Sequence, residues 1–400
     1  MNEKSNKINE IGSDGRTSAS SQSRRTAKAS DIVMFSVFIL FIFGFSIAAL
    51  ITKDRDFSEM ENRNLAQKPE FSFKSLKEGK FTSDLESYIS DQMFLKDALV
   101  SLKTDCDRAA LKTSLNGIYF AEDGYLIQQY TQDMDRIKEN IGYINDWAEN
   151  IDCPVDFLLI PNAVSVLNEK LPASAVNDDQ LGSMAAAAQL LSPKINLYTP
   201  FQELKALSDS GIQAFYRTDH HWTSEGAKTV YDWYMQTSGQ AVPIVDYDIE
   251  TIEDFYGTLY SKAPSAFVKP DKMHLYSNPN GKYTIERTTE AAVTDSLYDR
   301  SFLGKKDKYS AFMGGNFAEV KISTNAQNKE KVLVLKDSYA NAFMPFLADS
   351  YSEITMIDLR YYHFAENTVS ELIEKNGIDR VILLYNMDFI NSDQNFIWLS

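Results

Sequence analysis

Two short motifs contain the residue types that an acyl-transfer site needs. Asp219 and His221 stand two positions apart in an Asp-His-His-Trp run, and Ser338 follows an aspartate much later in the chain. Serine, imidazole and carboxylate are the nucleophile, the general base and the group that orients the base in such sites. In an extended segment, residues i and i+2 face the same side, so we expect Asp219 and His221 to share a face and His220 to point elsewhere. The motifs predict a catalytic triad of Ser338, His221 and Asp219.

Each motif also has a simpler interpretation. An Asp-Ser pair is more often a helix cap, and a His-His-Trp run is more often a packed aromatic turn. Asp219, His220 and His221 could also ligate zinc. Structural zinc sites more often use cysteine, however, and this chain has 2 cysteines and 4 histidines. We therefore expect no metal and no cofactor.

Short apolar runs alternate with stretches of helical period over much of the chain. The apolar runs are residues 155–160, 195–198, 332–335, 354–357 and 381–385. The helical patterns between them include residues 202–209, 224–237, 341–348 and 366–376. Continuous apolar strands are typical of parallel sheets that are buried on both faces. The alternation predicts an α/β fold, a three-layer α/β/α sandwich with a parallel sheet.

This order of elements places Ser338 where ligands bind in such folds. Ligands of open parallel sheets bind beyond the carboxyl ends of the strands, and Ser338 comes shortly after Leu335, which ends a predicted strand. A helix that follows would aim its first N–H groups at the site. The backbone N–H of Ser338 could therefore donate to an oxyanion.

Two regions depart from the alternation. Residues 240–330 are rich in turn residues and aromatic residues, which predicts a β-rich insertion between the base and the nucleophile. Residues 53–110 are polar, with apolar positions at helical spacing from Leu76 to Phe94. That spacing predicts a juxtamembrane helical segment that packs on the domain. The domain itself is expected to span residues 111–400.

One apolar segment near the N-terminus predicts a membrane anchor. Residues 32–52 carry no charged residue and match the ~20 residues that a helix needs to cross a bilayer. A cleaved signal peptide has a shorter apolar stretch of ~7–15 residues and a small-residue cleavage site, which this segment lacks. Basic residues precede the segment. We therefore expect residues 1–31 to be a disordered cytoplasmic tail and the C-terminal domain to be extracytoplasmic, on the cell membrane.

The net charge limits the classes of binding partner, and the cysteine content limits the possible disulfide bonds. The formal net charge of -16 argues against nucleic acid, because phosphate binding needs a basic face. Cys106 and Cys153 could form a bridge in an exported domain. Two thiols do not make a disulfide framework in a chain of this size, so we expect a fold that does not depend on the bridge.

The Asp-His-His-Trp run resembles the motif that names the DHHW protein family, which is grouped with the alginate O-acetylation proteins among the SGNH-hydrolase-like proteins. Further segments that match the pattern are Glu61-Asn62-Arg63, Asp91-Gln92, Lys96-Asp97, Asp307-Lys308-Tyr309-Ser310, Gly315-Asn316, Lys336-Asp337-Ser338-Tyr339 and Asp358-Leu359-Arg360. Together the segments cover most of the chain beyond the apolar segment. The resemblance implies a circularly permuted SGNH-like fold, in which the Asp-His pair precedes the serine.

The resemblance also implies where an oxyanion hole would lie. SGNH enzymes use a glycine and an asparagine there, and the corresponding strand ends carry Arg360 and Asn386. Both are candidate oxyanion donors, although Arg360 could instead pair with Asp337. Lys336 stands where the nucleophile signature has glycine, which would allow close backbone approach. Candidate substrate-binding residues are Trp222, Tyr339 and Asn316.

The resemblance implies a membrane-anchored O-acyltransferase, with acetyl as the expected acyl group. The enzyme would modify a cell-surface polysaccharide through an acyl-enzyme. The expected partner is a multi-pass membrane acyltransferase that supplies the acyl group. Two alternatives stay open. One is a carbohydrate esterase with the same triad. The other is a non-catalytic glycan-binding or assembly protein, which the departures at Lys336 and Arg360 favour.

Overall fold

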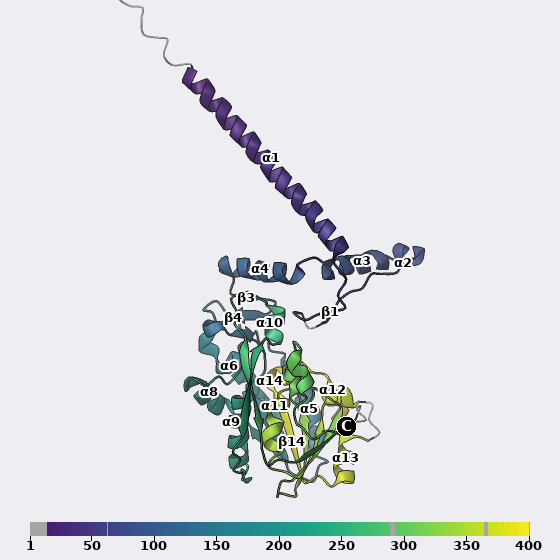
Figure 1. The fold of residues 1–400 in the computed structure, drawn as a ribbon. Helices are drawn as coiled ribbons and strands as arrows, with labels where there is room; N and C mark the ends of the chain where they lie inside the picture. Colours follow the sequence, from purple (N-terminus) through teal and green to yellow (C-terminus); the bar gives the residue numbers. More distant parts are fainter. Residues whose placement is uncertain (1–13, 62, 289–292, 364–366, 400) are drawn as a thin grey trace, which may run out of the picture. The chain divides into compact units, whose positions relative to one another are not determined.

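The computed structural model describes residues 14–61, 63–288, 293–363 and 367–399. The chain divides into two compact units. The N-terminal unit comprises residues 1–58 and 64–96, and the C-terminal unit comprises residues 59–63 and 97–400. The two units are described separately below, and Figure 1 labels their helices and strands.

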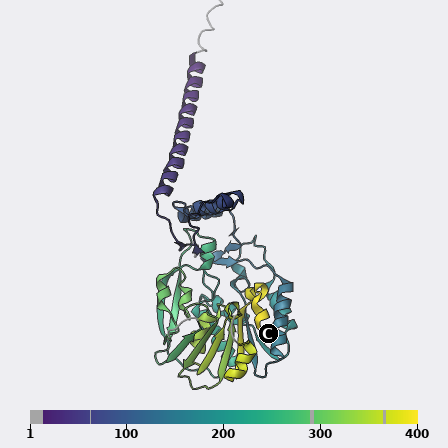
Figure 2. The same cartoon turned by 90° about the vertical axis from the view of Figure 1, so that its right-hand side faces the viewer.

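A seven-stranded sheet forms the centre of the C-terminal unit, in the order β10-β11-β13-β12-β14-β6-β7. The strands are β6 (Val155–Ile160), β7 (Ile195–Tyr198), β10 (Tyr283–Arg287), β11 (Glu319–Thr324), β12 (Lys331–Lys336), β13 (Glu353–Ile357) and β14 (Arg380–Asn386). Strands β13, β12, β14, β6 and β7 are parallel, and β11 and β10 extend the sheet in antiparallel fashion. Figure 2 shows these strands side by side.

Helices cover both faces of the sheet because its inner strands are apolar on both sides. Successive residues of β12 belong to opposite hydrophobic clusters, with Val332 and Val334 in one and Leu333 and Leu335 in the other. The first cluster is completed by α8 (Phe201–Asp209), α9 (Ser224–Thr237) and α11 (Ala340–Leu347). The second is completed by α5 (Met134–Ala148), α7 (Gln180–Leu190), α13 (Val369–Asn376) and α14 (Met387–Ser392). The predicted three-layer α/β/α architecture is confirmed.

The region predicted as a β-rich insertion contains strands of two kinds. β8 (Asp248–Phe255) and β9 (Asp271–Ser277) form a separate antiparallel pair, whereas β10 and β11 join the edge of the main sheet. The short helix α10 (Thr258–Lys262) lies between β8 and β9 in the chain. Residues 289–292 of this region lie outside the described part of the chain. The insertion is thus partly integrated into the sheet.

Smaller elements complete the C-terminal unit. β3 (Ser114–Leu115), β4 (Ile118–Phe120) and β5 (Leu126–Gln128) form a three-stranded antiparallel sheet. The short helices are α6 (Ala163–Val166) and α12 (Leu359–Tyr362), and α4 (Lys96–Ala109) precedes the small sheet. Helix α13 begins with a capping box, in which Thr368 and Glu371 bond to each other's backbone N–H groups. Cys106 and Cys153 are both free thiols.

The N-terminal unit contains the apolar segment. Helix α1 (Asp14–Ile51) includes a stretch, Ser30–Ala49, that is long and apolar enough to cross a membrane. It begins inside the segment predicted as a tail, of which residues 1–13 lie outside the described residues. The helices α2 (Phe73–Lys77) and α3 (Lys80–Asp91) follow. The two-residue strands β1 (Phe57–Ser58) and β2 (Arg63–Asn64) lie between α1 and α2 in the chain.

Candidate active site

The Asp-His-His-Trp run forms a tight turn between α8 and α9. Phe215 and Trp222 pair as an isolated antiparallel bridge, and the N–H of Tyr216 donates to the carbonyl of His221 at 3.1 Å. The first residues of α9 close the turn, because Thr223 caps the helix by accepting from the N–H of Gly226. These bonds fix the backbone on both sides of the two histidines.

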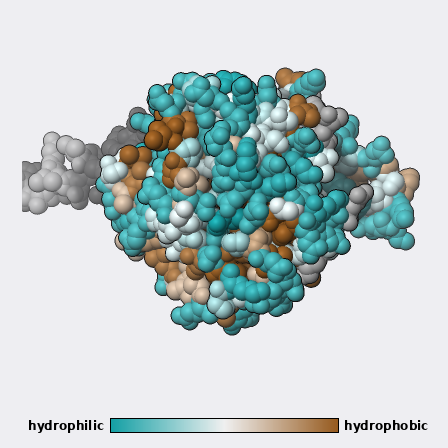
Figure 3. Space-filling view, turned by 90° about the horizontal axis from the view of Figure 1, so that it is seen from below, coloured by the Kyte–Doolittle hydropathy of each residue, from teal (hydrophilic) through white to brown (hydrophobic). Residues whose placement is uncertain are grey.

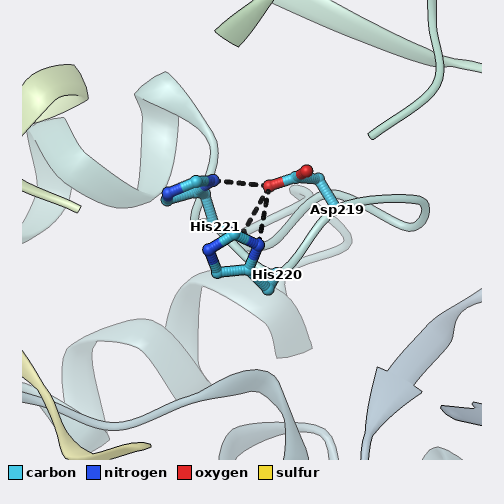
Figure 4. A group of neighbouring side chains, drawn as sticks. All are labelled: Asp219, His220 and His221. Carbon is cyan, nitrogen blue, oxygen red and sulfur yellow. Dashed lines mark hydrogen bonds and ion pairs between the residues drawn. The ribbon is translucent and has the colours of Figure 1, made fainter. Parts of the chain in front are cut away.

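Within this turn, His221 bonds to both of its expected partners. Its Nδ1 lies 2.5 Å from Oδ1 of Asp219, and its Nε2 lies 2.7 Å from Oγ of Ser338. The N–H of His221 also donates to Oδ1 of Asp219 at 3.0 Å. Figure 4 shows the carboxylate of Asp219 directed at the imidazole of His221. The structure thus brings the three residues of the expected triad together in a hydrogen-bonded chain.

The prediction that His220 points away from Asp219 and His221 is wrong. The ring of His220 lies against that of His221, with centroids 3.8 Å apart, and its Nδ1 is 3.5 Å from Oδ1 of Asp219. The reason is that residues 218–221 bend instead of running as a strand, so the alternation of faces does not apply. The Nδ1 of His220 also lies 2.7 Å from Oγ1 of Thr258. Burial, followed by repulsion from His221, lowers the pKa of His220 to about 3.

The carboxylate of Asp219 is held in its charged form. Its Oδ2 accepts from the N–H of Thr258 at 2.7 Å and from the hydroxyl of Thr258 at 3.1 Å. Burial acts to raise the pKa of Asp219, but attraction to His220 and His221 and the hydrogen bonds from His221 and Thr258 outweigh it. The net effect holds the pKa of Asp219 well below its usual range. No local sequence pattern identified Thr258 as a partner.

The ring of Tyr309 stacks on the imidazole of His221. The ring centroids are 3.7 Å apart and the planes 8° apart, and the hydroxyl of Tyr309 donates to the carbonyl of Ser338 at 3.1 Å. Tyr309 is buried, so the ring restricts His221 to one orientation. The sequence analysis included Tyr309 only as part of a matching segment. Its contacts with both His221 and Ser338 are visible only in the folded chain.

Ser338 sits in the turn that leads from β12 into α11. The N–H of Tyr339 donates to Oδ1 of Asp337 at 2.8 Å, which tightens this turn. The other carboxylate oxygen of Asp337 accepts from the N–H and the side-chain amide of Asn386, at 2.7 and 2.6 Å. Among the residues that the structure describes, none accepts a hydrogen bond from the N–H of Ser338. That N–H is therefore available to a developing oxyanion.

Arg360 pairs with Asp358, whereas Asp337 had been considered as its partner. Its Nε lies 2.8 Å from Oδ1 of Asp358 and its Nη2 lies 2.5 Å from Oδ2. The buried carboxylate of Asp358 caps α12 and also lies 3.6 Å from Nζ of Lys336. Arg360 and Asn386 line the same cavity as Ser338. Both candidate oxyanion donors are therefore near the nucleophile.

The three candidate substrate-binding residues have structural partners. Trp222 and Tyr339 are fully buried, and the indole N–H of Trp222 donates to the carbonyl of Tyr339 at 2.9 Å. The hydroxyl of Tyr339 donates to the carbonyl of His220. Asn316 accepts from Nζ of Lys336 at 2.9 Å. These contacts join the loop of His220 to the turn of Ser338 and satisfy the buried lysine.

A cavity of about 160 Å³ opens beside Ser338. Its polar lining consists of Gln128, Gln129, Asn162, Gln180, His220, Arg360, Asn386, Asp388 and Ser392. Asn386 ends β14, and Asn162 lies shortly after the end of the neighbouring strand β6. The side-chain amide of Asn162 donates to Oδ1 of Asn386 at 3.0 Å. A polar residue that follows a buried strand after only Pro161 was the signal that could have identified Asn162. The lining offers both donors and acceptors to a hydroxylated ligand.

Asp219, His220 and His221 also have the residue types of a metal site, with ligand atoms within 4.8 Å of one another. Both nitrogens of His221 are already engaged, by Asp219 and Ser338. Oδ2 of Asp219 accepts two hydrogen bonds from Thr258. A cation would have to displace these bonds, so the donor set fits a proton-transfer chain better than a metal centre.

Comparisons with known proteins show which proteins this chain is similar to. Residues 203–357 match the model of the DHHW protein family. A crystal structure of a DHHW family protein from Eubacterium siraeum is 26% identical, with a TM-score of 0.61, and the match covers 72% of this chain and 95% of that one. Bacillus cereus PatB1 is 24% identical, with a TM-score of 0.58, over 68% and 96%. PatB1 with a sulfonyl adduct is 23% identical, with a TM-score of 0.59, over 71% and 98%.

No curated protein matches this chain. The resemblance to the DHHW family that the sequence motifs indicated is confirmed. The likeness to PatB1 lies below 25% identity and shows a shared fold.

Proposed function

We propose that this protein is a membrane-anchored, extracytoplasmic O-acyltransferase that transfers an acetyl group to a hydroxyl of a cell-surface polysaccharide. One observation carries the proposal, namely the hydrogen-bonded chain from Oγ of Ser338 through His221 to Asp219. Both distances lie within or just short of the range, ~2.6–3.2 Å, in which a base can take a proton from a nucleophile. The polar cavity beside Ser338 provides a place for the acceptor.

The first half-reaction forms an acyl-enzyme. Oγ of Ser338 attacks the carbonyl carbon of the acyl donor while its proton moves to Nε2 of His221. The carboxylate of Asp219 holds the tautomer with Nδ1–H and stabilises the imidazolium that forms. His221 then gives the proton to the departing group of the donor. The acyl group remains as an ester on Ser338.

The second half-reaction reverses the roles. A sugar hydroxyl in the cavity gives its proton to Nε2 of His221 and attacks the acyl carbonyl. The bond between the acyl carbon and Oγ of Ser338 then breaks, and His221 returns the proton to Oγ, which leaves the new sugar ester and restores Ser338. The amide and carboxylate groups of Asn162, Gln128 and Asp388 line the cavity and can orient the hydroxyls of the acceptor. Water competes for the same ester, so acceptor binding decides between transfer and hydrolysis.

The tetrahedral intermediates need donors for their oxyanion. The N–H of Ser338 is one, and the guanidinium of Arg360 and the amide of Asn386 line the same cavity. Asn386 donates one amide N–H to Asp337, and Arg360 donates from Nε and Nη2 to Asp358, so each keeps a further N–H that can serve as the second donor. Loss of one such donor costs roughly 3–4 kcal/mol of transition-state stabilisation.

The N-terminal helix supports the location that we propose. The apolar stretch of α1 would anchor the chain, with the N-terminus inside and the C-terminal unit outside. An extracytoplasmic enzyme needs an acyl donor on its own side of the membrane. A multi-pass membrane acyltransferase that carries acyl groups across the bilayer would meet this need and is the partner we propose.

Acyl-enzyme trapping tests the chemistry directly. The purified full-length chain is mixed with an activated acetyl ester, and peptide mass spectrometry locates the acetyl group. We expect acetylation of Ser338 in the unchanged chain and in the control Ser301→Ala, which alters an exposed serine away from the cavity. Ser338→Ala should show none and His221→Gln very little. Acetylation that persists at the same rate in Ser338→Ala would refute the mechanism.

Product analysis separates the two enzymatic alternatives. When an oligosaccharide acceptor is added to the acetylated enzyme, a transferase gives acetylated sugar, whereas a carbohydrate esterase gives free acetate. A non-catalytic glycan-binding protein would show neither product, and its glycan binding would be unchanged by Ser338→Ala.

A further inference from the structure

The N-terminal unit carries an apolar face on α2 and α3 that no residue of the described helices covers. The short helix α2 has no buried residue, and the only buried residue of α3 is the acidic Asp91. The most exposed apolar side chains here are Phe71 at 57%, Phe73 at 83% and Ile89 at 58%. Monomeric proteins rarely leave large apolar side chains grouped in water, so such a group marks an interaction surface.

Helix α3 is amphipathic. Phe81, Leu85 and Ile89 follow one another at spacings of four residues, which places them on one side of the helix. Ser83 and Ser87 are exposed and project from the opposite side. The helix therefore separates an apolar stripe from a serine stripe along its length.

The same apolar character continues onto α2. The ring of Phe71 packs edge-on against those of Phe73 and Phe81, with centroids 5.4 and 5.2 Å apart, and so links the start of α2 to the start of α3. Gly79 makes the joint between the two helices with a φ of 76°, a conformation that favours glycine. In Figures 1 and 2 the two helices run across the axis of α1 near its carboxyl end.

Polar contacts hold α3 in this position. The hydroxyl of Tyr88 donates to the carboxylate of Asp54 at 2.9 Å, and the side-chain amide of Gln92 donates to the carbonyl of Arg55 at 2.9 Å. Phe94, just beyond α3, meets Phe45 with ring centroids 6.0 Å apart. Phe45 belongs to the stretch of α1 that is apolar enough to cross a membrane. The end of α3 is thus level with the apolar span.

We propose that α2 and α3 lie flat on the lipid bilayer, with their shared apolar face in the headgroup boundary of the leaflet in which α1 ends. Amphipathic helices of this kind bury one face roughly 5–10 Å into that boundary. Residues 68–96 contain five lysines (Lys68, Lys74, Lys77, Lys80 and Lys96) and five acidic residues (Glu70, Glu78, Asp84, Glu86 and Asp91), so their net charge is zero. Apolar burial, and not attraction to anionic lipid, would hold the helices in place.

Seen from below, the molecule presents a mainly hydrophilic surface on which hydrophobic residues occur in small separate groups (Figure 3). The proposal rests on α1 crossing the membrane and is independent of the acyl-transfer chemistry.

Site-directed spin labelling of the full chain in lipid nanodiscs tests the proposal. Cys106 and Cys153 are first replaced by serine, and single cysteines are placed at Phe73 and Ile89 on the apolar face or at Ser83 and Ser87 on the opposite face. A cysteine at Leu40, within the apolar stretch of α1, reports whether the anchor itself is in lipid. The measurement is the accessibility of each label to oxygen, which partitions into lipid, and to a water-soluble nickel chelate.

We expect the oxygen-to-nickel ratio at Phe73 and Ile89 to be severalfold higher than at Ser83 and Ser87, and to be the same in phosphatidylcholine and phosphatidylglycerol discs. Equal ratios at all four positions would overturn the proposal. Labels at Phe73 and Ile89 that are shielded from both reagents would also overturn it, because the face would then be covered by the C-terminal unit or a second copy. A nickel-accessible label at Leu40 would refute the anchor on which the proposal rests, and a high ratio seen only in phosphatidylglycerol would indicate electrostatic adsorption instead.

Discussion

At the scale of single residues, the candidate site is a hydrogen-bonded chain from Ser338 through His221 to the buried carboxylate of Asp219. Asp219 accepts from His221 and Thr258 and is almost inaccessible to solvent. A buried carboxylate with this many donors stays ionised. In the proposed mechanism it would stabilise the imidazolium formed when Ser338 gives up its proton. The stacked ring of Tyr309 leaves His221 little freedom to turn away.

The stability of the folded chain should therefore depend on the ionisation of Asp219. Its pKa is lower in the folded chain than the usual ~3.9, so its stabilising contribution is full above about pH 4 and declines as the pH falls below that value. We expect Asp219→Asn to lower the free energy of unfolding by on the order of 2 kcal/mol at pH 7 and by less at pH 3. Denaturant unfolding at the two pH values measures this. The control Asp135→Asn, at an exposed side chain, should change little at either pH, and a gap that widens at pH 3 would contradict the assignment.

His220 should not contribute to the pH dependence of the reaction. Its pKa is lowered to about 3, so its ring is already neutral through the range in which a catalytic histidine titrates. We expect His220→Gln to reduce the rate by less than His221→Gln does and to leave the acidic limb of the pH–rate profile above pH 5 unchanged. Rates of acetyl-Ser338 formation between pH 5 and 8 provide the test. A shift of that limb in His220→Gln would show that His220 carries the titrating proton.

At the scale of elements, the start of α10 is built around the carboxylate of Asp219. The N–H of Thr258, at the first turn of α10, donates to that carboxylate. Gly257 comes immediately before, and a Cβ atom placed on it would overlap the side chain of Asp219. The segment that joins β8 to β9, which includes Gly257 and α10, thus contacts the candidate site.

This close approach gives a test of the element. Gly257→Ala should push Asp219 or α10 aside, with a loss of about 1–3 kcal/mol in stability and a reduced rate of Ser338 acetylation. Gly304→Ala is the matched control, because no atom lies within 4 Å of the added Cβ, and its effect should stay within about 0.5 kcal/mol. Thermal unfolding and acetyl-enzyme formation measure the two quantities. Equal behaviour of the two variants would mean that the segment adjusts without cost.

At the scale of the whole molecule, the proposed arrangement has the catalytic unit outside the membrane. The charge of the chain fits this arrangement, because basic residues precede the apolar stretch and the chain as a whole carries a formal net charge of -16. The net negative charge does not suit nucleic-acid binding, which requires a basic face.

A thiol-labelling experiment tests this topology. Cys106 is exposed on α4, whereas Cys153 is only partly accessible. We expect a membrane-impermeant maleimide to label the protein in intact cells and expect labelling to disappear in Cys106→Ser. Labelling that requires permeabilised cells would place the C-terminal unit on the cytoplasmic side and contradict the proposed location.

Much of the framework could be predicted from the sequence because it depends on local patterns. Runs of apolar residues such as 155–160 and 381–385 appear as the buried strands β6 and β14. A strand that is apolar on both faces must be covered on both faces, so the layered fold follows from the runs alone. The residue types of the expected triad could also be identified from the sequence, because serine, imidazole and carboxylate together suit acyl transfer.

Other features depended on the tertiary structure, because they join residues far apart in the chain. The approach of Ser338 to His221 requires the turn after β12 and the loop before α9 to meet beyond the same edge of the sheet. By contrast, the pairing of Arg360 with Asp358, two residues before it, is a local contact at the start of α12 that the sequence alone did not distinguish from pairing with Asp337. Trp222 could have been a substrate contact on chemistry alone, but it is buried in the folded chain. Residue types and local periods set which elements form and which chemistry is available, whereas burial and long-range contacts decide which of those groups reach the cavity.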